Sequence, residues 1–316
     1  MPIVKVSDLA YVRLQSPSLD EAEEFLTAFG LVRAERTRDR LYMRGTDAPH
    51  HVHVTELGPS RFRGLAFYVE DERDLQRLTS CPGASGVESI DEPGGGRRVR
   101  LTDPLGYSVE VVCGMEQLAP LPAPALVLNT GTDKLRRRGE LLRLEQRRPS
   151  QVKRIGHAVL MAPNAAATMQ WYRDTLGLLA SDKVYDGAPE HVVAWFSRCD
   201  RGEQFVDHHT VLCFESPIAG LNHVSFEVQT FDDLMVGHEH LRHRGKYRHV
   251  WGIGRHLLGS QIFDYWEDPW RRVHEHWTDS DVLNASARPG LHPIETGLSN
   301  QWGDAPPEEF VRHAVP

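Results

Sequence analysis

Three possible metal ligands stand side by side in the segment Arg-Arg-Val-His-Glu-His-Trp-Thr-Asp at 271–279. His274, Glu275 and His276 each offer a nitrogen or oxygen atom that a divalent cation can bind. The side chains of a β-strand alternate between its two faces, so Glu275 points one way and both histidines point the other way. Either Glu275 or the histidine pair can therefore face a site, and the segment alone leaves both arrangements open.

Two histidines far upstream favour Glu275 as the side chain that faces a site. His157 and His223 each stand in a short apolar segment typical of a strand. Two imidazoles and one carboxylate from three strands can occupy one face of an octahedron around a metal, with three adjacent positions left for other ligands. This is the geometry of non-haem iron(II) enzymes that activate oxygen. We therefore predict a metal site formed by His157, His223 and Glu275.

The strands that would carry these ligands belong to a pattern that occurs twice in the chain. Residues 9–31 and 156–178 both read as a strand, a turn with a proline, and an amphipathic helix that stops at a glycine. Later segments correspond in the same order: 50–57 with 208–215, 64–78 with 223–241, and 102–112 with 267–277. The repeat predicts two similar halves, each made of strand–helix units with additional strands.

The repeat also separates residues that the fold needs from residues that chemistry needs. Glu110 aligns with the glutamate of the second half, so this carboxylate occurs twice. His157 aligns with Ala10, and His223 aligns with Gly64, so the two histidines occur only in the second half. We therefore expect a metal in the second half and none in the first.

Composition is typical of an ordinary globular protein. The chain has 316 residues, of which 40% are hydrophobic and 25% charged, and its net charge of −8 disfavours nucleic acid as a partner. No apolar run approaches the roughly 20 residues of a membrane helix, and the first residues do not read as a signal peptide. We expect a cytoplasmic protein without membrane contact, with reduced, buried thiols at Cys81, Cys113, Cys199 and Cys213.

Four segments are expected along the chain. Residues 1–120 would form a metal-free pair of modules, and the proline-rich, basic stretch 121–150 would connect it to the metal-binding pair at 151–282. Residues 283–316 would form a tail that packs on the catalytic half or at an oligomer interface. The histidine-rich run at 237–245 is expected on the solvated face of a helix.

The second half resembles the type I extradiol ring-cleaving dioxygenases of the vicinal oxygen chelate superfamily, the group that includes catechol 2,3-dioxygenase. The resemblance is carried by Gly156-His157, by Leu-Asn-His-Val-Ser-Phe-Glu-Val around His223, and by the block from Gly254 to Asp279. It extends over nearly the whole chain, because this family also has a metal-free first module. It implies an α+β fold in which tandem βαβββ modules form two funnel-like mixed barrels, the glyoxalase-like fold.

The resemblance also implies roles for residues around the metal. His209 is similar to the family's acid–base histidine, and its neighbour His208 is the competing assignment. His256 and Tyr265 resemble the histidine and tyrosine that line the diol and oxygen pocket. In the Asp-Pro turn of the second half, Arg271 replaces the family's glycine, which puts the geometry of that turn in question.

The implied activity is extradiol cleavage of a catechol-type diol by O2, which gives a muconic-semialdehyde-type product in aromatic compound degradation. The implied metal is iron(II), and manganese(II) could use the same ligands. The substrates would be a small aromatic diol and O2, and the family implies a homo-oligomer, a tetramer or larger. Two alternatives stay open: another metal enzyme of the superfamily, such as a para-diol dioxygenase or an isomerase, and a metal-free module that binds aromatic molecules.

Overall fold

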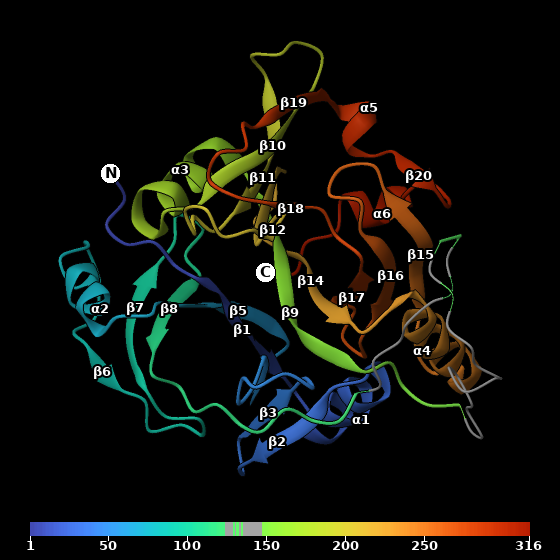
Figure 1. Cartoon of the computed structure of the whole chain (residues 1–316). Coiled ribbons are helices and arrows are strands. Elements are labelled where there is room, and N and C mark those ends of the chain that lie inside the picture. The colour runs from blue at the N-terminus through green and yellow to red at the C-terminus, as the bar shows by residue number, and fades with distance from the viewer. Residues whose placement is uncertain (124–128, 130, 133, 135–146) are drawn as a thin grey trace.

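Each half of the chain repeats the order strand, helix and three strands twice (Figure 1). The computed structural model describes residues 1–123, 129, 131, 132, 134 and 147–316. Most of the connector predicted at 121–150 therefore lies outside the described residues. The first half contains the helices α1 (Leu19–Phe29) and α2 (Glu72–Leu78) and the strands β1 (Asp8–Ser16), β2 (Val32–Arg36), β3 (Arg40–Arg44), β4 (His53–Leu57), β5 (Arg61–Tyr68), β6 (Glu88–Ser89), β7 (Arg97–Thr102) and β8 (Ser108–Cys113).

The second half follows the same order, with one short additional strand and a structured C-terminal segment. Its helices are α3 (Ala165–Leu176) and α4 (Phe231–Arg244), and its strands are β9 (Val152–Ala162), β10 (Leu179–Tyr185), β11 (Val192–Arg198), β12 (Val206–Asp207), β13 (Val211–Glu215), β14 (Gly220–Val228), β15 (His249–His256), β16 (Ile262–Glu267) and β17 (Val273–Thr278). The C-terminal segment contains β18 (Val282–Leu283), β19 (Gly290–Pro293), α5 (Ile294–Gly297), β20 (Asn300–Trp302) and α6 (Glu308–Val311).

The strands of each half form one large mixed sheet. The strand orders are β2-β3-β4-β1-β5-β8-β7-β6 and β19-β10-β11-β13-β9-β14-β17-β16-β15-β20. In both sheets the first strands of the two modules pair antiparallel, and each also pairs in parallel with the last strand of its own module. The strands curve around a centre in each half, and the long helices lie outside them (Figure 1). The predicted fold class and the predicted repeat are confirmed.

The helix that follows the first strand ends in the same way in both halves. Ser18 and Asn164 cap the N-termini of α1 and α3 by accepting a hydrogen bond from a backbone N–H of the first turn. The helices end at Gly30 and Gly177, whose φ angles of 115° and 78° lie in the left-handed region. Glycine reaches this region without a Cβ clash, which explains why both helices stop where the sequence predicts.

One apolar core extends through both halves, because α1 packs against the second sheet. Phe29 of α1 lies 5.8 Å from Phe226 of β14, measured between ring centroids. Among the cysteines, Cys199 and Cys213 are buried and Cys81 and Cys113 are half-buried, and all four are free thiols. The described residues include no helix with the length and apolar character that crossing a membrane requires.

The Asp-Pro turn keeps its geometry in both halves although only one half has the glycine. The carboxylates of Asp103 and Asp268 each accept two backbone N–H groups of their turn, all at 2.9 Å. Gly106 has a φ of 87°, and Arg271, at the same position of the second turn, has a φ of 66°. The second turn therefore holds a residue with a Cβ in the left-handed region, where such residues are strained.

We predict that Arg271→Gly raises the free energy of unfolding by about 1 kcal/mol, because glycine removes the left-handed strain. The side chain that is lost contributes little, since Arg271 is exposed and its nitrogen lies 3.8 Å from Glu267. In the reciprocal variant Gly106→Ala, the free energy of unfolding should fall by a similar amount, although the added Cβ would meet no atom within 4 Å. Urea denaturation measures both, and equal stability of Arg271→Gly and the parent would contradict the prediction.

Candidate metal centre

Three neighbouring strands bring the predicted ligands together. His157 lies on β9, His223 on β14 and Glu275 on β17, and Ser225 of the middle strand pairs with both His157 and Glu275. One ligand atom from each of the three side chains lies within 4.8 Å of the other two. His157 Nε2 and His223 Nε2 are 3.0 Å and 3.5 Å from Glu275 Oε2. All three residues are buried, and Glu275 is 0% exposed.

The polar atoms at this point lack partners of their own. Both Glu275 oxygens and His223 Nε2 make no hydrogen bond to any described residue, although they are buried. Buried polar atoms without partners cost about 1–3 kcal/mol each. A divalent cation between them would satisfy them all, and two imidazoles with one carboxylate suit iron(II) or manganese(II). The residues present therefore fit the implied metal.

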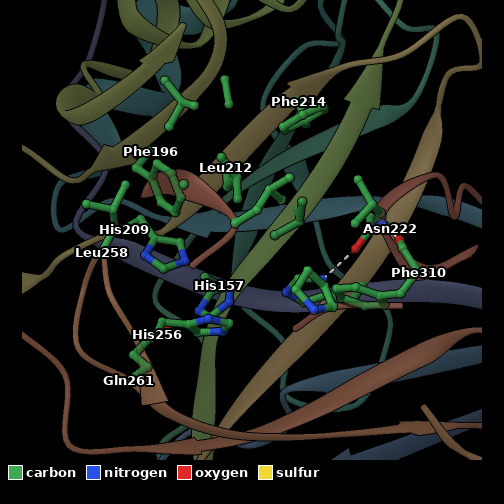
Figure 2. A pocket seen from close by; sticks show the side chains of 18 of the residues that line it. His157, Phe196, His209, Leu212, Phe214, Asn222, His256, Leu258, Gln261 and Phe310 are labelled. Carbon is green, nitrogen blue, oxygen red and sulfur yellow. Dashed lines mark hydrogen bonds between the residues drawn. The ribbon is translucent and has the colours of Figure 1, made fainter. Parts of the chain in front are cut away.

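The neighbouring asparagine sets the orientation of one ligand. His223 Nδ1 lies 2.7 Å from Asn222 Oδ1, the contact drawn as a dashed line at Asn222 in Figure 2. Because an amide oxygen only accepts hydrogen bonds, His223 Nδ1 carries the proton and Nε2 keeps its lone pair for a metal. Asn222 is not among the predicted site residues, although the pattern Asn-His within the strand is visible in the sequence.

The charge states of the ligands suit a cation. Burial by itself would raise the pKa of the Glu275 carboxyl, but the adjacent His157, together with His223, holds that pKa well below its usual value. Burial lowers the pKa of His223 to about 4 against the opposing effect of Glu275. At neutral pH the carboxylate is thus ionised and this imidazole is neutral, which are the forms that bind metals.

The two histidines beside Glu275 face the boundary between the halves. His276 Nε2 donates to the backbone carbonyl of Phe29 at 2.6 Å, and the two rings stack with centroids 3.7 Å apart. His274 packs against Phe25 and Phe29 of α1. Strand alternation therefore resolves the segment at 271–279: Glu275 points into the barrel, and both histidines help to join the barrels.

A cavity that opens to solvent lies beside this ligand group. His209, His256 and Tyr265 line it together with His157 and His223. Tyr265 Oη lies 2.9 Å from His256 Nε2, and the rings of His209 and His157 are 4.1 Å apart. Figure 2 shows His157 between His209 and His256 in that view. Five of the six residues predicted for the site thus line one cavity, and the sixth, Glu275, contacts two of them, His157 and His223.

Comparison with known proteins decides the family. The family model described as the Glyoxalase/Bleomycin resistance protein/Dioxygenase superfamily matches residues 154–271. Metapyrocatechase 2 of Cupriavidus necator is 31% identical over 312 residues, which cover 98% of this chain and 92% of that protein. The chain belongs to the extradiol dioxygenase family. The predicted family and the predicted enzyme class are confirmed.

Two further comparisons concern the fold and the metal of relatives. The iron-dependent extradiol dioxygenase of Rhodococcus jostii (strain RHA1) is 24% identical over 288 residues, which cover 84% of this chain and 87% of that protein. The Mn(II)-bound glyoxalase of Novosphingobium aromaticivorans superposes with a TM-score of 0.80 at 23% identity and covers 99% of this chain and 96% of its own. The same fold therefore occurs with iron-dependent and manganese-bound proteins.

The strand register of this extradiol dioxygenase corrects one part of the internal alignment. Ser225 pairs with His157, and in the first half Ala66 pairs with Tyr11. Tyr11 therefore stands at the position of His157, and the prediction that Ala10 does so was wrong. The alignment was anchored on the glycines at the helix ends, but α3 has 12 residues and α1 has 11.

In the first half, the glutamate that corresponds to Glu275 is surrounded by hydrogen-bond donors, two of them positively charged. Glu110 accepts hydrogen bonds from Tyr11 Oη at 2.6 Å and from Arg13 Nε at 3.1 Å. Arg98 is a third donor residue, with a hydrogen bond of 3.2 Å. Gly64 occupies the position of His223, and a Cβ there would lie 1.9 Å from the carbonyl oxygen of Ser108. The first barrel therefore neutralises its glutamate with guanidinium groups and has no histidine at either of the two positions that correspond to His157 and His223.

The C-terminal segment closes one side of the cavity. Phe310 lines it and lies 4.8 Å from Tyr265 and 5.7 Å from His223 between ring centroids. The amide of Asn222 donates to the backbone carbonyls of Phe310 and His313, both at 2.9 Å. Phe310 is not among the predicted site residues, because no local sequence pattern shows that a distant tail returns to the site.

A second group of possible ligands lies behind the cavity wall. His238 Nδ1 and His249 Nε2 lie 3.1 Å and 2.8 Å from Asp264 Oδ1. Trp266 Nε1 donates to the other oxygen at 2.6 Å. These contacting atoms all have hydrogen-bond partners, unlike those at Glu275, so the group forms a network that holds α4 onto β15 and β16. The prediction that the run 237–245 is solvated was wrong for His238, which is buried.

We predict that Glu275→Gln loses the bound metal, because a neutral amide replaces the only anionic ligand and leaves two neutral imidazoles to hold a divalent cation. Metal content after purification measures this loss independently of activity. His238→Ala is the matched control: it should keep one metal per chain while the free energy of unfolding falls by about 2 kcal/mol. Full metal content in Glu275→Gln, or loss in His238→Ala, would refute the assignment of the two groups.

Proposed function

We propose that this extradiol dioxygenase cleaves a catechol-type diol with O2 at a metal held by His157, His223 and Glu275. The observation that carries the proposal is the convergence of unpartnered ligand atoms beneath a cavity lined by further acid–base groups. The ring would open beside the diol and give a muconic-semialdehyde-type product. We propose this reaction as a step in the degradation of aromatic compounds.

We propose iron(II) as the metal. When bound, it would accept the two diol oxygens and O2 at its remaining positions, lower the pKa of a diol hydroxyl and bring both substrates together. Manganese(II) accepts the same donors, and the relatives described above include both metals. The protein's own contribution is the facial arrangement of three ligands, which keeps one side of the metal towards the cavity.

We propose that His209 takes and returns the diol proton. Its ring contacts the ring of His157 and lines the cavity, within reach of a diol oriented by the metal. Burial, followed by the nearby His157 and His208, lowers the pKa of His209 well below its usual value. His208 is not among the residues that line the cavity; its ring nitrogens contact Asp182 and His209, which supports the choice of His209.

We propose that His256 and Tyr265 bind the oxygen atoms of the substrate and of O2 from the opposite side. The two side chains contact each other at 2.9 Å, and His256 Nε2 lies 3.8 Å from Glu275 Oε1. Burial raises the pKa of Tyr265 well above its usual value, with a further contribution from Glu275. Its hydroxyl therefore keeps its proton at neutral pH and serves as a hydrogen-bond donor to developing negative charge.

We propose that the diol carries an apolar ring substituent. Away from the metal the cavity wall is hydrocarbon, with Phe196, Leu212 and Phe214 on one side (Figure 2) and Phe310 on another. No lysine or arginine is found among the described residues that line it. A carboxylate on the ring would lose its hydration without gaining a cation, which costs several kcal/mol. Alkyl or aryl catechols fit this wall better than catechol acids do.

A metal-dependent isomerase that draws ligands from both halves fits the structure less well. The first barrel offers Tyr11 and Gly64 where the second has histidines, and its glutamate is already neutralised. A metal-free binding module would leave the Glu275 oxygens buried without partners. Homo-oligomer formation and a cytoplasmic location stay predictions.

Anaerobic reconstitution with ferrous salt tests the proposed reaction. The loaded protein is then exposed in air to catechol, methylcatechols, a biphenyl diol and trihydroxybenzenes. We expect a yellow ring-fission product from at least one substrate and none from the metal-free protein. A colourless product without O2 uptake would indicate a different reaction.

We predict that His209→Phe keeps the metal and lowers kcat by about 100-fold or more, because phenylalanine cannot accept the diol proton. Metal content and steady-state O2 consumption are measured on the same sample. Turnover within twofold of the parent would exclude His209 as the acid–base residue.

We predict that substrate charge decides specificity. The value of kcat/KM should be at least about 100-fold lower for 3,4-dihydroxybenzoate than for 4-methylcatechol, since the two differ mainly in a carboxylate that would be desolvated. The matched neutral control is the methyl ester of the acid, which should recover most of the difference. Equal kcat/KM for acid and methylcatechol would contradict the proposed apolar substituent.

A further inference from the structure

A chain of hydrogen-bonding side chains runs from the cavity towards solvent. His209 Nδ1 lies 3.2 Å from His208 Nδ1, and His208 Nε2 lies 2.8 Å from Asp182 Oδ2. The other carboxylate oxygen of Asp182 lies 3.0 Å from His292 Nε2 and accepts the backbone N–H of Gly290 at 3.1 Å. Exposure rises along the chain, because the side chains of His208, Asp182 and His292 are 4%, 15% and 33% exposed.

The carboxylate fixes the direction of every hydrogen bond in this chain. An ionised carboxylate only accepts, so His208 Nε2 must carry a proton that it donates to Asp182. The neutral form of His208 then has a lone pair on Nδ1, which accepts from His209 Nδ1–H. His209 is left with its unprotonated Nε2. Asp182 thus determines, across an intervening ring, which nitrogen of His209 can act as a base.

Packing holds the chain in this arrangement. Phe196 lies 5.5 Å and 5.2 Å from the rings of His208 and His209, both measured between centroids. Gly259 packs closely on the imidazole ring of His208, since a Cβ at residue 259 would lie 3.0 Å from His208 Nδ1. Asp182 lies on β10, whose parallel pairing with β19 brings His292 to the carboxylate. The C-terminal segment therefore completes the chain.

We propose that Asp182 and His208 are positioning residues that make His209 a base with its free Nε2 turned to the substrate. This rests on the proposed role of His209. When the diol proton moves to His209 Nε2, the proton on His209 Nδ1 can move to His208 Nδ1. His209 is then neutral again, and the positive charge lies on His208 beside Asp182. The reverse transfers return the proton to the product, so no proton is gained or lost.

The variant Asp182→Asn tests the direction of the hydrogen bonds between Asp182, His208 and His209. Because Gly290 N–H donates to Oδ1, the amide of the variant keeps its oxygen there and turns its NH2 towards His208 Nε2. The NH2 group would donate, His208 would donate to His209, and His209 would present an N–H to the cavity. We expect kcat to fall at least about tenfold while KM for the diol and metal content change by less than about twofold.

The matched control is Asp207→Asn. The side chain of Asp207 is 17% exposed, close to the 15% of Asp182. It pairs with Arg154 at 2.7 Å, outside the hydrogen-bonded series from His209 to His292. It should lose stability but keep kcat within about twofold of the parent. If Asp182→Asn does not fold, His208→Phe replaces it, because phenylalanine keeps a ring of similar size and removes both nitrogens.

A spectroscopic probe separates positioning from simple structural support. 4-Nitrocatechol, bound without oxygen to the iron-loaded protein, changes colour with each proton that it loses. We expect 4-nitrocatechol bound to Asp182→Asn to keep one more proton than 4-nitrocatechol bound to the parent or to Asp207→Asn. The same ionisation in all three proteins, or unchanged kcat in Asp182→Asn, overturns the inference. A parent protein that cleaves no diol would overturn the proposed function itself.

Discussion

The whole second barrel depends on one buried carboxylate. Glu275 is completely shielded from water, and a charge in such a place must be compensated or it destabilises the fold. In the first barrel, Arg13 and Arg98 compensate the charge of the equivalent Glu110. In the second barrel, the imidazoles of His157 and His223 lie around Glu275 instead, an arrangement that suits a cation. The same buried glutamate therefore has different surroundings in the two halves, because each half places different side chains next to it.

Backbone pairing gives the ligand set its geometry. Three ligands on adjacent strands stand at heights set by the strand register, so they meet without any loop having to close over them. The same alternation that turns Glu275 inward turns His274 and His276 outward to α1 of the first half. The first half therefore supports the ligand group directly, because it packs against the reverse side of the strand that carries the carboxylate.

The C-terminal segment connects the site to its surroundings in two ways. Through Phe310 it adds an apolar side chain to a cavity whose described lining contains no lysine or arginine. Through β19 it brings His292 to Asp182 and extends the polar contacts of His209 to the surface. The apolar wall and the hydrogen-bonded side chains meet at Phe196, which lines the cavity and packs on the rings of His208 and His209.

The repeated α+β architecture, the helix ends at Gly30 and Gly177, and the candidate ligands could be predicted from the amino-acid sequence, because periodicity, capping glycines and side-chain chemistry are local properties. The folded structure was needed to show that Tyr11 occupies the position equivalent to His157, that His238 is buried, and that residues from the tail reach the cavity. Each of these depends on contacts between segments far apart in the chain. Register shifts of one residue and docking of a distant strand leave no local pattern, so three-dimensional packing alone resolves them.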